Sequence, residues 1–111
     1  MARFQKVIRA ADLPAGTGRV VHVDGVAIAL FNVDGRFHAI DNTCPHQGGP
    51  LGEGFLDGCR VTCPWHFWQF DVTRGHAPEF PEMTIDRYVV KVEGGDVFVS
   101  DTPLTRRVRE G

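Results

Sequence analysis

No stretch of this 111-residue sequence is apolar over a length that could cross a membrane. Residues 1 to 6 also lack the apolar run of a secretory signal peptide. We therefore expect a soluble, cytoplasmic protein with no membrane segment. The length is enough for one domain and too short for two separate cores.

Two further classes of function are excluded by what is missing. The formal net charge is only −2, so the basic excess typical of nucleic-acid-binding domains is absent. The sequence also has no glycine-rich dinucleotide fingerprint, so we do not expect it to oxidise NAD(P)H by itself. Neither nucleic acid nor a membrane is an expected partner.

Cysteine is scarce, with three residues in the chain. An odd count without a pairing pattern indicates a reducing compartment. Cys59 shares strand parity with Val61 and Cys63, so we expect it to be a small buried packing residue. A redox role or a role as an extra ligand is the alternative.

The other two cysteines belong to matched half-sites. Cys44 and His46 form the first, Cys-Pro-His, and Cys63 and His66 form the second, Cys-Pro-Trp-His. Two thiolates and two imidazoles are the ligands of a Rieske-type 2Fe–2S centre. The same set can hold a structural zinc ion. Zinc sites usually pair Cys with Cys and His with His, whereas each half here is mixed, so a zinc-binding module is the remote alternative.

The flanking residues sharpen this prediction. The segments Cys-Pro-His-x-Gly-Gly-Pro-Leu (44–51) and Cys-Pro-Trp-His-x-Trp-x-Phe-Asp (63–71) resemble the two cluster loops of Rieske ferredoxins and of aromatic-ring dioxygenases. The resemblance implies one Rieske 2Fe–2S cluster per chain. It places the inner iron on Cys44 and Cys63 and the outer iron on His46 and His66, near the surface. No catalytic residue is predicted.

Small and apolar residues in the first loop have expected roles of their own. Gly48 and Gly49 should allow positive φ and a close approach of backbone N–H groups to the cluster. Leu51 should cover the cluster and keep water away from it.

The rest of the chain is a series of short alternating stretches separated by turns. Asp24-Gly25 and Asp34-Gly35 are two-residue hairpin signals. Helical periodicity is limited to one expected turn at 10–13. The expected strands lie at 21–23, 26–30, 36–40, 59–62, 68–72, 88–92 and 97–99. The sequence therefore predicts an all-β protein.

The resemblance extends this to a Rieske fold over residues 4–101. It implies an antiparallel β-sandwich base with a small inserted cluster-binding subdomain at about 42–72. We expect residues 76–84 to be a loop packed against the cluster-bearing tip. Residues 103–111 should form a flexible tail.

Several side chains near the second half-site have expected environments. Trp68 and Phe70 share one strand face and should pack beneath the cluster. Phe67 stands where the family usually has Gly, and it either marks an exposed docking surface or fills a local gap. Among the other histidines, His76 follows the second loop closely and may not be excluded from packing or docking there. His22 and His38 are expected on strand surfaces or loops.

Position by position, the resemblance also indicates the redox class. High-potential relatives of respiratory complexes have cluster-bonding hydroxyls at the positions of Trp68 and Phe70 and disulfide cysteines at the positions of Gly49 and Trp65. None of these groups is present here, and hydrogen bonds to the sulfurs raise the potential. We expect a low-potential ferredoxin.

The predicted function is a soluble electron carrier between a flavoprotein ferredoxin reductase and a terminal oxygenase, with no catalytic activity of its own. An accessory subunit of a nitrite reductase or another multicomponent oxidoreductase is the alternative, because residues 18–42 also resemble the small subunit of assimilatory nitrite reductase. A Rieske domain detached from an oxygenase would need its catalytic iron site in a further domain. The redox partners, the downstream substrate and the oligomeric state remain open.

Overall fold

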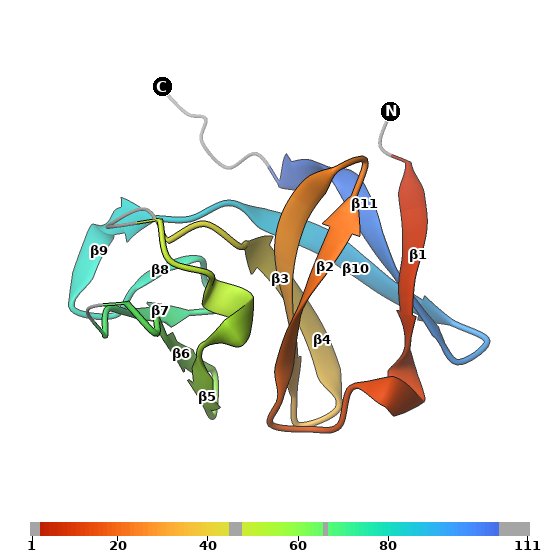
Figure 1. The fold of residues 1–111 in the computed structure, drawn as a ribbon, viewed down its shortest axis with the longest axis horizontal. Coiled ribbons are helices and arrows are strands. Elements are labelled where there is room, and N and C mark those ends of the chain that lie inside the picture. The colour runs from red at the N-terminus through yellow and green to blue at the C-terminus, as the bar shows by residue number, and fades with distance from the viewer. Residues whose placement is uncertain (1–2, 45–47, 66, 105–111) are drawn as a thin grey trace.

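The computed structural model describes residues 3–44, 48–65 and 67–104, and its strands form two antiparallel sheets (Figure 1). The only helical elements in these residues are two single turns, Ala10–Asp12 and Leu51–Glu53. The all-β prediction and the helical turn near residue 10 are confirmed. Within the same residues, no helix is long and apolar enough to span a membrane.

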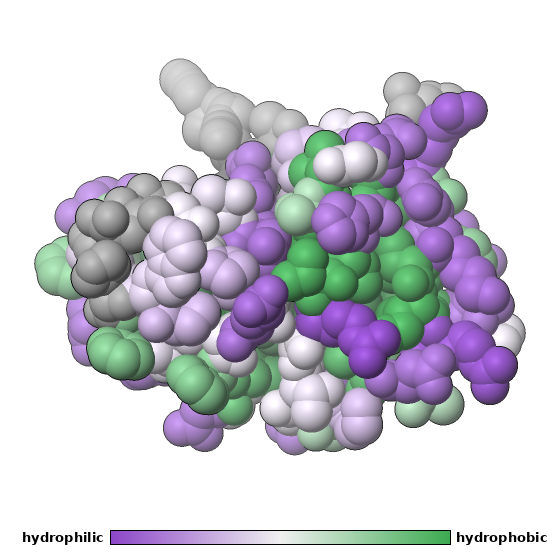
Figure 2. All heavy atoms as spheres, viewed as in Figure 1, coloured by the Kyte–Doolittle hydropathy of each residue, from purple (hydrophilic) through white to green (hydrophobic). Residues whose placement is uncertain are grey.

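The larger sheet forms the base of the molecule and has the order β1-β11-β10-β4-β3-β2. Its strands are β1 (Phe4–Arg9), β2 (Gly18–Val23), β3 (Val26–Val33), β4 (Arg36–Asp41), β10 (Arg87–Glu93) and β11 (Asp96–Leu104). The sheet curls until β2 approaches β1 and β11. Ile28, Leu30 and Val97 are among the buried residues that it encloses. Figure 2 shows apolar side chains gathered on this face, between β2 and β1, with polar residues around them.

Hairpin turns set the register of the base as predicted. Asp24 and Gly25 have φ values of 52° and 80°, and Asp34 and Gly35 have values of 53° and 92°. Two successive residues with positive φ are required by the tight turn whose twist matches that of paired strands. Asp and Gly tolerate this conformation. Val23 consequently pairs with Val26 across the first turn.

The smaller sheet is inserted between β4 and β10 and has the order β5-β6-β7-β8-β9. Its strands are β5 (Phe55–Asp57), β6 (Arg60–Thr62), β7 (Gln69–Asp71), β8 (His76–Ala77) and β9 (Phe80–Thr84). The insertion begins and ends at neighbouring points, because the Asp41 N–H donates to the Asp86 carbonyl over 2.9 Å. A second buried core joins the insertion to Phe31 and Ile40 of the base.

Two expectations about irregular segments were wrong. The segment 76–84 contains β8 and β9 and extends the smaller sheet, although Pro78 and Pro81 suggested a loop. Proline is compatible with strand ends and with edge strands, and β9 lies at the sheet edge. Pro103 and Leu104 are also paired, opposite Tyr88 and Arg87 in β10. The remainder of the predicted tail lies outside the described residues.

Candidate metal centre

Two of the four predicted ligands lie in the buried core at the insertion. Cys44 is 1% exposed and Cys63 is 0% exposed, and both belong to one apolar cluster. Both are free thiols. The sequence motifs, separated by residues 47 to 62, are therefore brought together by the packing of the insertion against the base.

Both cysteine loops are closed by the same backbone hydrogen bond. The Cys44 N–H donates to the Gly49 carbonyl over 2.9 Å, and the Cys63 N–H donates to the Trp68 carbonyl over 2.7 Å. In each case the acceptor is the fifth residue after the cysteine. An isolated bridge between Thr43 and Pro50 continues the closure of the first loop. The two loops thus present their cysteines from equivalent, tightly closed bases.

The two glycines of the first loop have different roles. Gly48 has a φ of 81°, and its N–H donates to the Cys44 carbonyl over 2.7 Å, so positive φ is required there as expected. For Gly49, only the expected close approach is found, since it is absent from the residues with positive φ. A Cβ at Gly49 would lie 2.7 Å from the Cys63 Sγ and 3.0 Å from the Trp65 Cγ. Gly49 is needed for space.

Apolar side chains surround the thiols. Leu51 and Phe70 are both 0% exposed and belong to the same buried cluster as the cysteines. Trp68 is half-buried against that cluster, with its ring centroid 6.5 Å from that of Phe70. The predicted packing of these three residues is confirmed. The environment excludes water from the cysteine side of the centre.

Burial raises the pKa of the Cys63 thiol. A hydrogen bond from the backbone at Trp65 opposes this effect, and the neighbouring Cys44 thiol adds to it. Two neighbouring thiols in an apolar core therefore hold their protons until a metal replaces them, because metal ligation requires thiolates.

His46 and His66 lie outside the described residues, as does Gln47 between the first half-site and Gly48. Within the described part of the chain, no group of three or more His, Cys, Asp or Glu side chains could hold a metal ion. The Cys44 and Cys63 pair nevertheless fits the buried end of a 2Fe–2S cluster. Two adjacent thiols, apolar walls and a glycine that leaves room beside Cys63 are the features that such a group requires.

Exposed aromatic residues flank position 66. Trp65 is 50% exposed and Phe67 is 70% exposed. The φ of Phe67 is 61°, in a region where Cβ crowds the backbone of any residue except Gly. The alternative that Phe67 fills a local gap is therefore wrong, since most of the residue faces solvent.

Cys59 differs from its predicted environment. It lies in the turn between β5 and β6 and is half-buried, so its assignment to a strand and to the core was wrong. Its Sγ donates to Asp71 Oδ2 over 3.6 Å. The turn residues Asp57-Gly58 extend by one residue, because Gly58 alone takes a positive φ of 63° and β6 begins only at Arg60.

Asp71 is a structural residue that sequence reasoning missed. Its Oδ1 accepts hydrogen bonds from the Thr73 N–H, the Thr73 hydroxyl and the Arg74 N–H at 2.8, 2.6 and 3.2 Å. Burial would raise the pKa of Asp71, but these bonds and the one from Cys59 together hold it below the ordinary value. An aspartate that begins a turn ending at Gly75 is the signal that could have revealed this role.

The histidines outside the motifs occupy three environments. His22 is exposed on β2, as expected. His38 is half-buried in a cavity of about 210 Å³ where the base meets the insertion. His76 is half-buried on β8, with Nδ1 3.1 Å from the Ala77 carbonyl oxygen. Position on β8 places His76 in the smaller sheet.

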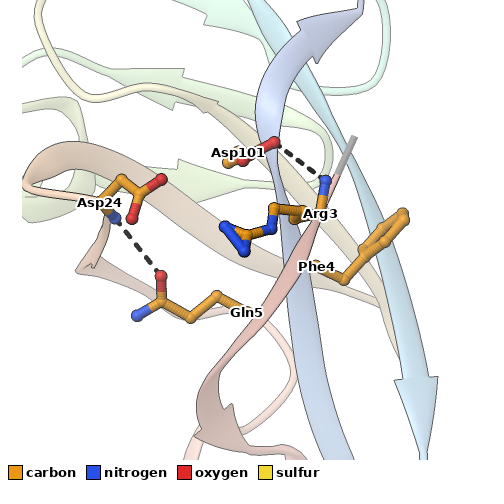
Figure 3. A pocket seen from close by; sticks show the side chains of 5 residues that line it. All are labelled: Arg3, Phe4, Gln5, Asp24 and Asp101. Carbon is orange, nitrogen blue, oxygen red and sulfur yellow. Dashed lines mark hydrogen bonds between the residues drawn. The ribbon is translucent and has the colours of Figure 1, made fainter. Parts of the chain in front are cut away.

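A second cavity, of about 320 Å³, belongs to the base alone (Figure 3). Its lining residues come from β1 and its approach, the β2–β3 turn and β11: Arg3, Phe4, Gln5, Asp24 and Asp101. The Asp24 N–H donates to the Gln5 side chain over 3.3 Å, and the Arg3 N–H donates to Asp101 over 3.0 Å. These bonds join the edge strands of the curled sheet.

Comparison with known proteins places this geometry in context. Residues 3–100 match the family model of the Rieske 2Fe–2S domain. The chain is 45% identical over 83 residues to the ferredoxin component of the p-cumate 2,3-dioxygenase system of Pseudomonas putida, covering 73% of this chain and 70% of that protein. It is 38% identical over 89 residues to the ferredoxin component of the naphthalene 1,2-dioxygenase system of Pseudomonas aeruginosa, covering 79% and 86% of the two chains.

The solved structures agree. One chain in a complex of reduced oxygenase and oxidised ferredoxin of carbazole 1,9a-dioxygenase superposes with a TM-score of 0.85 and 33% identity. The match covers 93% of this chain and 97% of that chain.

Proposed function

Because the chain belongs to the Rieske 2Fe–2S family, and within it to the ferredoxins of aromatic-ring dioxygenase systems, we propose that it carries single electrons from a flavoprotein reductase to a terminal oxygenase. Transfer of electrons to the oxygenase is the role of this group of ferredoxins. The reductase as electron donor and the identity of the oxygenase are the proposed part. The observation that carries the proposal is the pair of buried, adjacent thiols of Cys44 and Cys63 at the insertion.

The proposed ligands are Cys44 and Cys63 for the inner iron and His46 and His66 for the outer iron. When bound, the Rieske cluster supplies a one-electron carrier. The chain's own contribution is to hold the two thiolates in a core without water and to leave space at Gly49. A site enclosed in this way limits the rearrangement of solvent when the charge changes, which suits a protein that gains and loses single electrons.

We propose that the cluster-binding unit comprises residues 42 to 84, because β8 and β9 belong to its sheet and Asp86 closes the insertion against Asp41. The electron-carrying role needs no catalytic residue in this unit. Oxygen activation is accordingly assigned to the partner oxygenase. The alternatives of a structural zinc module and of a nitrite reductase subunit have no specific support from the geometry or the relatives.

The first experiment measures composition and electron transfer. Anaerobically purified protein should be brown and contain about two iron atoms and two acid-labile sulfides per chain. Terminal oxygenases and reductases of the p-cumate and naphthalene dioxygenase systems provide the assay, with aromatic product formation expected to depend on added protein. One zinc ion without sulfide would overturn the cofactor. A loaded cluster that reduces none of the oxygenases would overturn the proposed acceptor.

A further inference from the structure

We propose that Trp65 and Phe67 form a docking surface for the terminal oxygenase, which receives them in an apolar recess bordered by basic side chains. This inference rests on the proposed function. It goes further by naming the contact residues and the chemistry of the partner surface.

The first argument concerns Phe67. The residue is 70% exposed, so burial within the chain does little to stabilise it. Its φ of 61° is one that bulky residues rarely adopt, so the backbone does not favour it either. Neither the packing nor the local conformation of this chain therefore explains a phenylalanine here. An aromatic side chain held out from the surface can instead gain contacts on association.

Trp65 supplies the second argument. A Cβ at Gly49 would lie 3.0 Å from the Trp65 Cγ and 3.1 Å from its Cβ, so the base of this side chain is close to the first cysteine loop. The residue is nevertheless 50% exposed. A large aromatic side chain that is supported at its base and open to solvent loses little conformational freedom on docking. Trp is among the residues that most often dominate binding at interfaces.

The position of these residues connects docking with electron transfer. Trp65 and Phe67 are the immediate sequence neighbours of His66, the proposed ligand of the outer iron. A partner that contacts both residues is thereby brought to the ligand through which an electron would leave. Docking at any other exposed aromatic of the chain would not have this consequence.

Charge determines the rim of the complementary surface. Residues 42–84 contain five carboxylate side chains, two arginines and no lysine. Glu53, Glu79 and Glu82 are exposed in this unit. An acidic surface attracts a partner with basic side chains and accelerates the encounter at low salt. The apolar centre then provides the short-lived contact that is typical of small redox interfaces.

The test uses cluster-loaded protein and the oxygenase that wild-type protein reduces fastest in the preceding experiment. The second-order rate of electron transfer is measured by stopped-flow absorbance at limiting oxygenase concentration. Phe67→Gly and Phe67→Asn fit the positive φ without the aromatic ring, whereas Phe67→Trp keeps an exposed aromatic side chain. Phe55→Ser is the matched control, because Phe55 is 66% exposed on β5 of the same unit.

Phe67→Gly, Phe67→Asn and Trp65→Ala should each lower the rate about fivefold or more, the effect expected of an interface hot spot. Phe67→Trp and Phe55→Ser should stay within about twofold of wild type. Chemical reduction by dithionite and the midpoint potential should not change in the Phe67 variants. Added salt should slow the wild-type reaction.

Equal rates for wild type and the Phe67 variants would overturn the docking surface while leaving the proposed function intact. A rate that increases with salt would overturn the basic rim. Slower transfer from the reductase, with unchanged transfer to the oxygenase, would overturn the choice of partner. If wild-type protein reduces no oxygenase, the proposed function itself fails.

Discussion

The Gly49 backbone lies against the Cys63 thiol, so closely that a methyl group on its Cα would be 2.7 Å from Sγ. Because Gly49 also accepts the hydrogen bond that closes the loop of Cys44, it links the two cysteine loops. One residue without a side chain therefore fixes the distance between the halves of the proposed cluster site.

Gly49→Ala should reduce cluster loading. The added methyl group must displace either the Cys63 thiol or Trp65, and such overpacking costs about 1–3 kcal/mol. Iron and sulfide per chain are measured after anaerobic purification. Gly35→Ala is the matched control: its φ is 92° but its added Cβ has no atom within 4 Å, so it should cost stability without lowering the iron content. Equal iron in both variants would contradict the steric role of Gly49.

The midpoint potential should be near −150 mV, at about the lower end of the Rieske range. Trp68 and Phe70 provide no hydroxyl for the cluster sulfurs, and Phe70 is fully buried. Phe70→Tyr should raise the potential if its hydroxyl reaches a sulfur, and should otherwise cost about 1–3 kcal/mol for an unpaired buried group. Protein-film voltammetry measures the potential. Phe70→Leu separates packing effects from the hydroxyl, and a clearly positive wild-type value would contradict the low-potential assignment.

Cys59→Ser should leave the cluster intact. The serine hydroxyl can replace the thiol as donor to Asp71, which keeps its three bonds from Thr73 and Arg74. The free energy of unfolding should change by less than about 0.5 kcal/mol, as for a surface substitution. Iron analysis and denaturant titration check both points. A folded but colourless variant would show that Cys59 contributes to the cluster.

His38 should make the protein less stable in mild acid. Burial lowers the pKa of His38 from its ordinary value of 6.5; Arg87 and Arg36 act in the same direction, while Asp71 opposes them. The unfolded chain therefore binds more protons than the folded chain below about pH 6.5, and stability falls as the pH decreases through this range.

Denaturant titrations between about pH 5 and pH 8 measure this slope. His38→Gln should flatten the dependence relative to wild type, and His22→Gln, at an exposed position on β2, serves as the comparison. An unchanged slope in His38→Gln would contradict the assignment.

Local chemistry in the sequence determined much of the fold. Asp24-Gly25 and Asp34-Gly35 specify tight hairpins because their residues tolerate positive φ, and both turns occur where predicted. Alternation also identified the packed face of Phe70, because neighbouring strand residues point to opposite sides of a sheet. The cysteine motifs predicted a cluster because the residue types themselves define the ligand chemistry.

Other features have no local signal. The segment with Pro78 and Pro81 becomes part of a sheet only because β7 supplies a neighbouring strand through β8. Cys59 follows alternation in the sequence, but the turn at Gly58 displaces it from the strand.

The sequence by itself determined the ligand types, the hairpin turns and the β class, since each depends on residues close together in the chain. Only the tertiary structure decided that Cys44 and Cys63 share one dry core, that Gly49 is required for space, and that Phe67 faces solvent. Each of these depends on contacts between segments that are distant in sequence. Such contacts follow from the packing of the insertion against the base.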